Sequence, residues 1–317
     1  MQTSGIFAVA LLIALAIDLR WGEPAARWHP VVWMGRALEH VGSVTAPTEP
    51  TGRDLRSFWR AALGWSVLAL AFVVPAVLLQ TFILSHTPWW LASALLGVLI
   101  KPMLSWRMLR DEVMAVENAL DRSLHEGQTQ LGRLVSRDVH ALSAMQVRES
   151  AIESLAENLN DSVVAPVFWL VVGGLPGMVL YRFANTADAM WGYPGMRGGR
   201  YWQWAGKWAA RADDVLSWIP ARITAVALWL VSRCERWDDL ARSARRTPSP
   251  NSGWPMAAMA LALDVCLSKP DVYVLHPDGQ RAAPGDIARA VAIASRTLGC
   301  VMIAAVLFLV STWVVRT

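Results

Sequence analysis

Long apolar stretches constrain this chain more than any other feature of its sequence. The clearest is Arg60–Leu84, and shorter apolar runs lie near 5–19, 89–106, 162–181 and 298–315. A membrane-spanning helix needs about 20 predominantly apolar residues. The chain is 55% hydrophobic and contains 18 tryptophans, a residue that favours the membrane–water interface. We therefore predict an all-α, polytopic integral membrane protein with about four to six membrane segments.

Some of these segments should be broken or re-entrant. Pro166 and the run Gly173-Gly-Leu-Pro-Gly177 interrupt the apolar stretch 162–181. Broken helices free backbone N–H and C=O groups, which a bilayer tolerates only where they face a cavity or other protein groups. The turn Ser85–Pro88 lacks Lys and Arg, whereas arginines flank the helices on either side, so the turn should face outward.

The stretch at about 106–161 is polar and has helical periodicity. We interpret it as two or three amphipathic helices with a break at Glu126-Gly127, and with Ser136 or Asp138 capping a helix. It forms a cytoplasmic helical insertion in a single integral membrane domain that spans 1–317. Farther along, the composition predicts a helix over 256–267 and a loop over 270–284.

Charge and cysteine usage exclude several functions. The net charge is +4, but the arginines are scattered between the apolar runs and form no dense patch, which argues against nucleic-acid binding. The three cysteines are single and far apart, and CxxC and HExxH motifs are absent, so zinc and iron–sulfur sites are not expected. A P-loop is also excluded, because Lys207 is followed by Trp208.

An acidic stripe is the most unusual local feature. Glu149, Glu153, Glu157 and Asp161 recur at every fourth position of a predicted helix, with Asn158 alongside. Like charges at this spacing repel by roughly 0.2–0.5 kcal/mol per exposed pair. The stripe also runs directly into an apolar segment, where carboxylates are costly and usually mark a site. We interpret it as a cation or substrate site; the alternative is a solvated helix face neutralised by neighbouring arginines.

Further polar groups interrupt the apolar regions. They are Arg137, Asp138, Asn185, Asp188, Lys207, Arg211, Asp213, Asp214, Arg222 and Asn251. Mg²⁺ prefers carboxylates together with substrate phosphates, and arginine forks bind phosphate through two hydrogen bonds. The combination predicts phosphoryl chemistry on an anionic substrate. We expect these groups to converge with the acidic stripe on one face.

Each group also has a structural alternative. The pairs Asn185/Asp188 and Asp213/Asp214 are compatible with helix capping. Lys207 is compatible with a side chain that extends from a tryptophan-rich helix to the membrane interface. Arg222 is compatible with a purely structural ion pair to an aspartate.

Three blocks of sequence resemble the CobD/CbiB membrane proteins of cobalamin biosynthesis, the adenosylcobinamide-phosphate synthases. The blocks are Glu153-Ser-Leu-Ala-Glu-Asn-Leu-Asn-Asp161, Asn185-Thr-Ala-Asp-Ala-Met-Trp-Gly-Tyr193 and Ala212-Asp-Asp-Val-Leu-Ser-Trp-Ile-Pro-Ala-Arg222. Shorter matches, such as Asp18 and His29-Pro30, occur in the same order over nearly the whole chain. The chain departs from the family pattern at Gly22-Glu-Pro24, Ser136-Arg-Asp138 and Ser268-Lys-Pro270, where the family usually has Gly-Asp-Pro, Gly-Arg-Asp and Gly-Gly-Pro.

The resemblance implies an ATP-dependent amide ligase. It would join adenosylcobyric acid to (R)-1-amino-2-propanol phosphate, or to aminopropanol, with Mg²⁺ and ATP, and would release adenosylcobinamide phosphate. It implies a multi-pass protein of the bacterial inner membrane with a cytoplasmic active face. The implied partners are the corrinoid, the amine, the lipid bilayer, other corrinoid-pathway enzymes and a second copy of the chain in a homo-oligomer.

The predicted roles divide the polar residues into three groups. The catalytic residues are Glu153, Glu157 and Asp214. The substrate- and phosphate-binding residues are Arg137, Asp138, Asn158, Asn185, Lys207, Arg211, Arg222 and Asn251. The metal ligands are Glu157, Asp161, Asp188 and Asp213. Two other functions stay open: a non-catalytic membrane scaffold for corrinoid-pathway enzymes, and a transporter for an anionic solute, which broken helices would suit.

Overall fold

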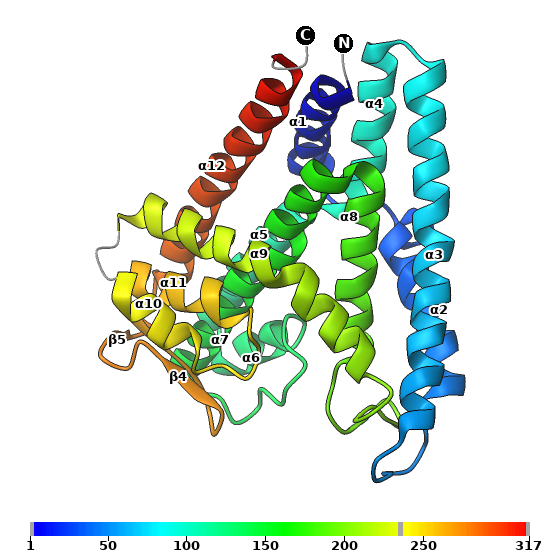
Figure 1. Ribbon diagram of the computed structural model, residues 1–317. Coiled ribbons are helices and arrows are strands. Elements are labelled where there is room, and N and C mark those ends of the chain that lie inside the picture. The colour runs from blue at the N-terminus through cyan, green and yellow to red at the C-terminus, as the bar shows by residue number, and fades with distance from the viewer. Residues whose placement is uncertain (1–2, 234–236, 315–317) are drawn as a thin grey trace. The chain divides into compact units, whose positions relative to one another are not determined.

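The computed structural model describes residues 3–233 and 237–314, and most of this length is α-helical (Figure 1). The chain divides into two compact units. Unit 1 comprises Met1–Leu104, Pro166–Leu216 and Ala305–Thr317; unit 2 comprises Ser105–Ala165 and Ser217–Ala304. The first stretch of unit 2 has nearly the bounds of the insertion predicted at about 106–161. The sequence did not predict that 217–304 would pack with it, and the single-domain organisation stays a prediction.

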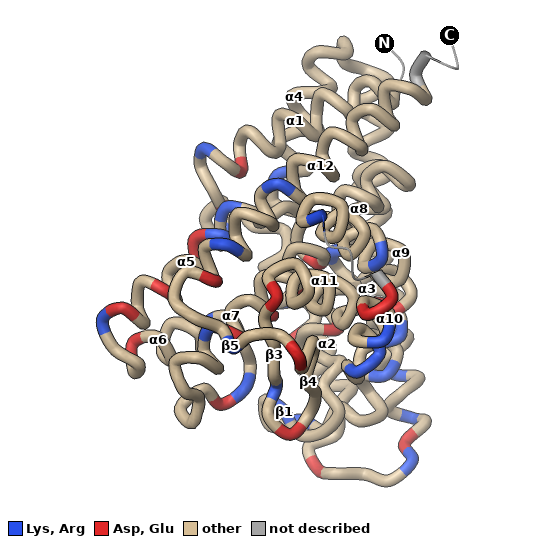
Figure 2. The backbone as a smooth tube through the Cα atoms, turned by 90° about the vertical axis from the view of Figure 1, so that its left-hand side faces the viewer, with Lys and Arg blue, Asp and Glu red and all other residues tan. Residues whose placement is uncertain are grey.

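Six helical segments in the described part of the chain are long and apolar enough to cross a membrane, which confirms the predicted all-α, polytopic fold. They are Thr3–Trp21, Leu55–His86, Trp89–Leu120, Ala144–Trp191, Lys207–Ser232 and Asp286–Thr312. Charge is segregated along several of them (Figure 2): in α1 (Thr3–Trp21) the charged residues stand only at the C-terminal end, and in α3 (Leu55–His86) the Lys and Arg residues stand only in the first turns.

Unit 1 is built mainly from helices that pack in pairs. α1 packs on α4 (Trp89–Ile100), and α2 (Pro30–Thr45) packs on α3. The helices of the first pair approach closely at Gly97, which has no side chain. A Cβ atom added there would lie only 2.7 Å from Ile13 Cγ2. Large apolar side chains of α3 stay exposed, among them Leu63, Leu70 and Leu78, as expected for a helix that faces lipid. The rest of unit 1 includes α8 (Ala165–Trp191), the hairpin β1 (Met196–Arg197) and β2 (Arg200–Tyr201), and the start of α9 (Lys207–Ser232).

A buried ion cluster joins the ends of α1 and α4, and the sequence analysis did not predict it. Lys101 Nζ lies 3.1 Å from Asp18 Oδ1 and 2.9 Å from Glu23 Oε2, with side chains only 4%, 0% and 16% exposed. His29 Nε2 lies 3.0 Å from the same Glu23 oxygen and its Nδ1 accepts from the Val31 amide at the start of α2. The cluster therefore ties three segments of unit 1 together through charges that are largely shielded from water.

The predicted break in the apolar stretch 162–181 is present. Gly174 has φ 62° and ψ −155° inside α8, a left-handed value of φ that glycine adopts without strain. The break frees the amide of Leu175, which donates to Gln80 Oε1 at 2.8 Å. A side chain of α3 thus satisfies a backbone group that lipid could not.

Unit 2 combines short helices with a small sheet. Its helices are α5 (Trp106–Leu120), α6 (Leu124–Leu131), α7 (Ala144–Leu159), the part of α9 from Ser217 onward, α10 (Trp237–Ala244), α11 (Gly253–Leu263) and most of α12 (Asp286–Val314). Strand β3 (Val265–Lys269) pairs antiparallel with β4 (Tyr273–Leu275) and parallel with β5 (Gln280–Arg281). The largely buried helix α7 packs against α5, α6, α11 and β3.

Four local predictions for unit 2 are wrong. The helical break lies at 121–123 and not at Glu126-Gly127, because Ser123 caps α6 by accepting from the Glu126 amide, and Gly127 packs against Leu120. Neither Ser136 nor Asp138 caps a helix; α7 begins at a capping box of Ser143 and Gln146. The helix predicted over 256–267 ends at Leu263, and strands replace part of the loop predicted over 270–284.

Candidate functional site

A polar cavity of about 180 Å³ lies in unit 2 beside α7. Three parts of the chain line it: the loop before α7, one face of α7, and the strands β3 and β4. Its polar and charged lining residues are Ser136, Arg137, Ser150, Glu153, Ser154, Glu157, Asn158, Lys269 and Tyr273. The cavity therefore holds two basic side chains and two carboxylates, which are packed together with hydroxyl and amide groups.

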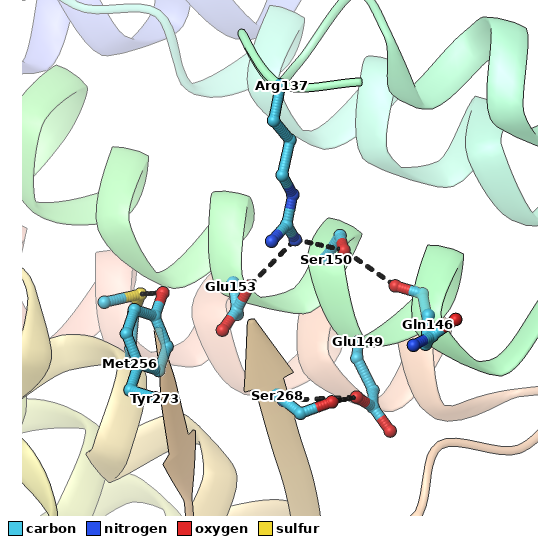
Figure 3. Close-up of polar contacts among 8 residues, drawn as sticks. All are labelled: Arg137, Gln146, Glu149, Ser150, Glu153, Met256, Ser268 and Tyr273. Carbon is cyan, nitrogen blue, oxygen red and sulfur yellow. Dashed lines mark hydrogen bonds and ion pairs between the residues drawn. The ribbon is translucent and has the colours of Figure 1, made fainter. Parts of the chain in front are cut away.

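Arg137 and Glu153 meet across this cavity (Figure 3). Arg137 Nη2 lies 3.4 Å from Glu153 Oε2 and donates to Ser150 Oγ at 2.5 Å. Each side chain keeps a second polar atom buried: within the described residues, Arg137 Nη1 and Glu153 Oε1 have no hydrogen-bond partner. Burying a polar group without a partner is costly. The Arg137 donor and the Glu153 acceptor therefore mark a place where a ligand could form the two missing hydrogen bonds.

Helix geometry explains which acids of the stripe reach the cavity. A spacing of four residues exceeds one helical turn, so the stripe rotates by about 40° around the axis at each step. Glu149 consequently faces the sheet, where it accepts from the Ser268 amide at 3.1 Å and from the Ser268 hydroxyl (Figure 3). Glu153 and Glu157 line the cavity. Asp161 lies in a π-helical segment, Asn160–Val164. Its Oδ1 accepts a hydrogen bond from the side-chain Nδ2 of Asn160 at 2.8 Å.

Strands β3 and β4 contribute two residues that the sequence analysis missed. Lys269 brings a second cation, and Tyr273 places its hydroxyl 3.8 Å from Met256 Sδ (Figure 3). Burial raises the pKa of Tyr273, and the negative charges of Glu153 and Glu157 raise it further. The phenol therefore stays protonated at neutral pH and can donate a hydrogen bond in the cavity.

Two other predicted site residues of unit 2, Asn158 and Asp138, are next in sequence to Glu157 and Arg137. Asn158 lines the cavity and donates to the Ser154 carbonyl at 2.9 Å. Asp138 is absent from the cavity lining, and its Oδ1 accepts from the His140 amide at 2.9 Å. Asp138 thus stabilises the loop that carries Arg137.

Arg222 and Asn251 form a second polar group in unit 2. Arg222 Nη1 donates to Asn251 Oδ1 at 2.6 Å, and Nη2 donates to the Pro250 carbonyl at 3.1 Å. The guanidinium lies 4.5 Å and 4.9 Å from the ring centroids of Trp218 and Trp254. None of these contacts involves an aspartate. The alternative in which Arg222 forms a structural ion pair with an aspartate is therefore wrong.

The remaining predicted residues belong to unit 1. Asn185 Nδ2 donates to Asp213 Oδ1 at 3.4 Å, which joins α8 to α9. Asn185 and Asp188 lie inside α8, and Asp213 and Asp214 lie inside α9, so the capping alternatives are wrong. The other two residues are Lys207, whose Nζ lies 3.4 Å from the Trp204 ring centroid, and Arg211, which is exposed. The predicted convergence of this group with the cavity of unit 2 stays a prediction.

The carboxylates of the cavity bear on whether Mg²⁺ can bind there. Across residues 3–233 and 237–314, no group of three or more His, Cys, Asp or Glu side chains is placed to hold a metal ion. Magnesium often needs only one or two carboxylates when substrate phosphates supply the other oxygens. Glu153, with its open buried oxygen, and Glu157 provide such a pair. The cavity thus fits a Mg²⁺ ion that arrives with a phosphorylated substrate.

Comparison with known proteins gives consistent matches. The family model described as CobD/Cbib protein matches residues 11–298. A probable cobalamin biosynthesis protein CobD of Methanothermobacter thermautotrophicus is 40% identical over 271 residues, covering 84% of this chain and 85% of the relative. The cobalamin biosynthesis protein CobD of Rhodobacter capsulatus is 36% identical over 313 residues, covering 92% and 94%. No solved structure matches significantly.

Proposed function

This chain belongs to the CobD/CbiB family and has a role in cobalamin biosynthesis, and on that premise we propose that it is an ATP-dependent carbon–nitrogen ligase. Its substrates are adenosylcobyric acid and (R)-1-amino-2-propanol phosphate, and its product is adenosylcobinamide phosphate. We place the protein in the bacterial inner membrane with the unit 2 cavity open to the cytoplasm, where ATP is available.

The reaction needs two steps. A carboxylate oxygen of adenosylcobyric acid attacks the γ-phosphorus of ATP, and ADP leaves. The amine nitrogen then attacks the acyl carbon, inorganic phosphate leaves, and a base takes the proton from nitrogen. The protein must therefore hold an ammonium group near a carboxylate, and a phosphate group near cations.

One observation carries the proposal: the cavity of about 180 Å³ presents an open arginine nitrogen beside an open glutamate oxygen. A molecule with a phosphate at one end and an ammonium at the other would satisfy both. Arg137 and Lys269 bind the phosphate, since guanidinium and ammonium groups are the usual phosphate ligands. Glu153 receives the amine and takes its proton, and the Tyr273 hydroxyl donates to a substrate oxygen.

Magnesium, when bound, neutralises phosphate charge and aligns the phosphoryl group for transfer. Glu157 is the residue best placed to hold it beside the amine. The cavity is too small for a corrinoid ring. Only the reacting carboxylate of the corrinoid enters it, and the ring stays outside. The roles predicted for Arg211, Asp188, Asp213 and Asp214, which belong to unit 1, stay predictions.

The direct test uses the detergent-purified protein with adenosylcobyric acid, aminopropanol phosphate and Mg-ATP. We expect an amide product of the correct mass and one ADP for each amide formed, with no continuing ADP release when either substrate is omitted. A protein that binds corrinoid-pathway enzymes but forms no amide would be a scaffold. Substrate flux into proteoliposomes without amide formation would indicate a transporter. Either outcome would overturn the proposal.

A substitution at Arg137 separates the amine subsite from the ATP subsite. Arg137→Gln should raise the KM for aminopropanol phosphate by about 10- to 100-fold, because a hydrogen bond to a charged group contributes about 1.5–3 kcal/mol. The KM for ATP should change by less than about threefold. Steady-state rates at varied amine and varied ATP measure both values. Arg133→Gln, an exposed arginine in the same loop region, is the control and should change neither. Equal effects on both substrates would contradict the assignment.

A further inference from the structure

A second cavity of unit 2, outside the proposed active site, gathers arginines from two helices. It has a volume of about 530 Å³ and is lined by Arg233 after the end of α9 and by Arg289 and Arg296 of α12. Its other lining residues are uncharged. Arg289 and Arg296 are two helical turns apart, so they lie on one face of α12.

The charge of this arginine cavity is only partly balanced within the described residues. Arg289 Nη1 lies 2.7 Å from Asp286 Oδ1, and its Nη2 donates to the Leu263 carbonyl at 3.1 Å. Arg296 donates through Nε to the Ala292 carbonyl at 3.3 Å. Its two terminal nitrogens take no part in that hydrogen bond and can bind a ligand. Clustered like charges repel one another unless an anion lies between them. An anionic group in the cavity would remove this repulsion.

The position of the arginine cavity along α12 indicates where that anion comes from. The charged residues of α12 are Asp286, Arg289 and Arg296, all in its first half (Figure 2), and the following run Thr297–Val314 carries no charge. At 1.5 Å per residue this run is roughly 27 Å long, close to the thickness of a bilayer's hydrocarbon core. Arg296 therefore stands where the apolar core of the membrane begins, at the depth of the lipid headgroups.

The part of α9 that leads to the cavity, although outside its lining, is also suited to lipid. On α9, Ile223, Val226 and Leu230 are exposed at helical spacing immediately before Arg233. An exposed apolar face that ends in arginines fits acyl chains on one side and headgroup phosphates on the other. A water-soluble phosphate compound would use the arginines but would leave these apolar side chains in water.

We propose that the arginine cavity of Arg233, Arg289 and Arg296 binds the phosphodiester headgroup of an anionic phospholipid. Guanidinium forks bind phosphate oxygens in pairs, and the exposed side chains of α9 contact the acyl chains. The site is separate from the amide-forming cavity, so it holds whether or not the proposed reaction is correct.

Native mass spectrometry of the full-length protein, with equal amounts of phosphatidylglycerol and phosphatidylcholine of the same acyl chains, tests the site. We expect the wild type to retain phosphatidylglycerol in roughly tenfold preference over phosphatidylcholine. The double variant Arg233→Gln/Arg296→Gln should retain the two lipids about equally. This double variant keeps Arg289, because that residue also forms an ion pair with Asp286. The matched control Arg133→Gln/Arg242→Gln removes two charges from exposed positions of the same unit and should keep the preference.

Two outcomes would overturn the proposal. One is a double variant that retains phosphatidylglycerol as well as the wild type does. The other is displacement of the lipid by millimolar ATP or inorganic phosphate, which would assign the arginines to a soluble ligand. If the double variant fails to fold in detergent, the single variant Arg296→Gln carries the test and should lose about threefold of the preference.

Discussion

Glu157→Gln is expected to reduce amide formation by about 100-fold or more while the protein stays folded and inserted in the membrane. Glu157 lines the proposed active-site cavity of unit 2 one turn beyond Glu153 and is only partly buried. Glutamine has nearly the same shape, so the substitution removes charge with little change in packing. The loss follows because a neutral amide cannot balance Mg²⁺ beside a substrate phosphate as a carboxylate does. Initial rates of product formation at saturating substrates measure the effect.

The Mg²⁺ dependence of the rate distinguishes a metal role from simple damage. The Glu157→Gln variant should need a higher Mg²⁺ concentration for half its maximal rate, and its thermal unfolding in detergent should match that of the wild type. The control is Glu126→Gln, an exposed glutamate of α6 that pairs with Arg122 in the turn just before that helix. It should retain full activity. Wild-type turnover by Glu157→Gln, with an unchanged Mg²⁺ response, would remove Glu157 from the site.

The acidic stripe shows how far local sequence predicts this site. Period-four spacing was enough to predict that Glu153 and Glu157 share one helix face, and both line the cavity. The same spacing could not predict that Glu149 would turn toward the sheet, because that depends on the accumulated rotation and on what packs against α7. The spacing also could not predict the direction of Asp161, since a π-helical segment changes the direction of the side chains that follow Leu159; its role as a metal ligand stays a prediction.

Lys269 and Tyr273 illustrate what sequence patterns cannot supply. They reach the cavity from β3 and β4, more than 100 positions beyond Glu153. Strands of three to five residues are too short for a convincing alternation, and the preceding apolar run extended the predicted helix past Leu263. What fixes these strands is tertiary: the buried carboxylate of Glu149 accepts the Ser268 amide and hydroxyl.

The break in α8 was predicted because its cause is local. Glycine adopts left-handed backbone angles at little cost, and proline cannot donate a hydrogen bond, so a Gly-Gly-Leu-Pro-Gly run interrupts a helix in most contexts. The partner that makes the break tolerable was not predictable, because Gln80 lies on another helix. The same limit applies to the Asp18, Glu23 and Lys101 cluster, because Lys101 is about 80 positions from the two acids and meets them only after α1 packs on α4.

Lys101→Met is expected to destabilise unit 1 by about 3–5 kcal/mol, the usual cost of removing one partner from a buried ion pair. Methionine fills the space of the lysine chain, so the loss measures charge more than volume. Asp18, which is 0% exposed, would keep a buried charge without its cation. Thermal unfolding in detergent, followed by tryptophan fluorescence, should show an apparent melting temperature lower by roughly 10 °C.

Acid should remove part of this stabilisation from the wild type. Burial alone raises the pKa of Glu23, but hydrogen bonds and charge from His29 and Lys101 outweigh it and hold the pKa below its ordinary value of 4.5. A carboxylate with a lowered pKa stabilises the folded state above pH 4.5, and that contribution is lost as the pH falls through the folded-state pKa. Lys101→Met should flatten this decline, because Glu23 then lacks its strongest cation.

A double substitution separates lost charge from lost packing. If the unpaired charge causes the instability, Lys101→Met/Asp18→Asn should be more stable than Lys101→Met alone by at least about 1 kcal/mol, since contacting residues couple by about 0.5–3 kcal/mol. Lys207→Met is the matched control: its cation contacts only the Trp204 ring among the described residues, so it should cost about 1 kcal/mol or less. A Lys101→Met variant as stable as this control would show that the ion cluster does not hold α1, α4 and the start of α2 together.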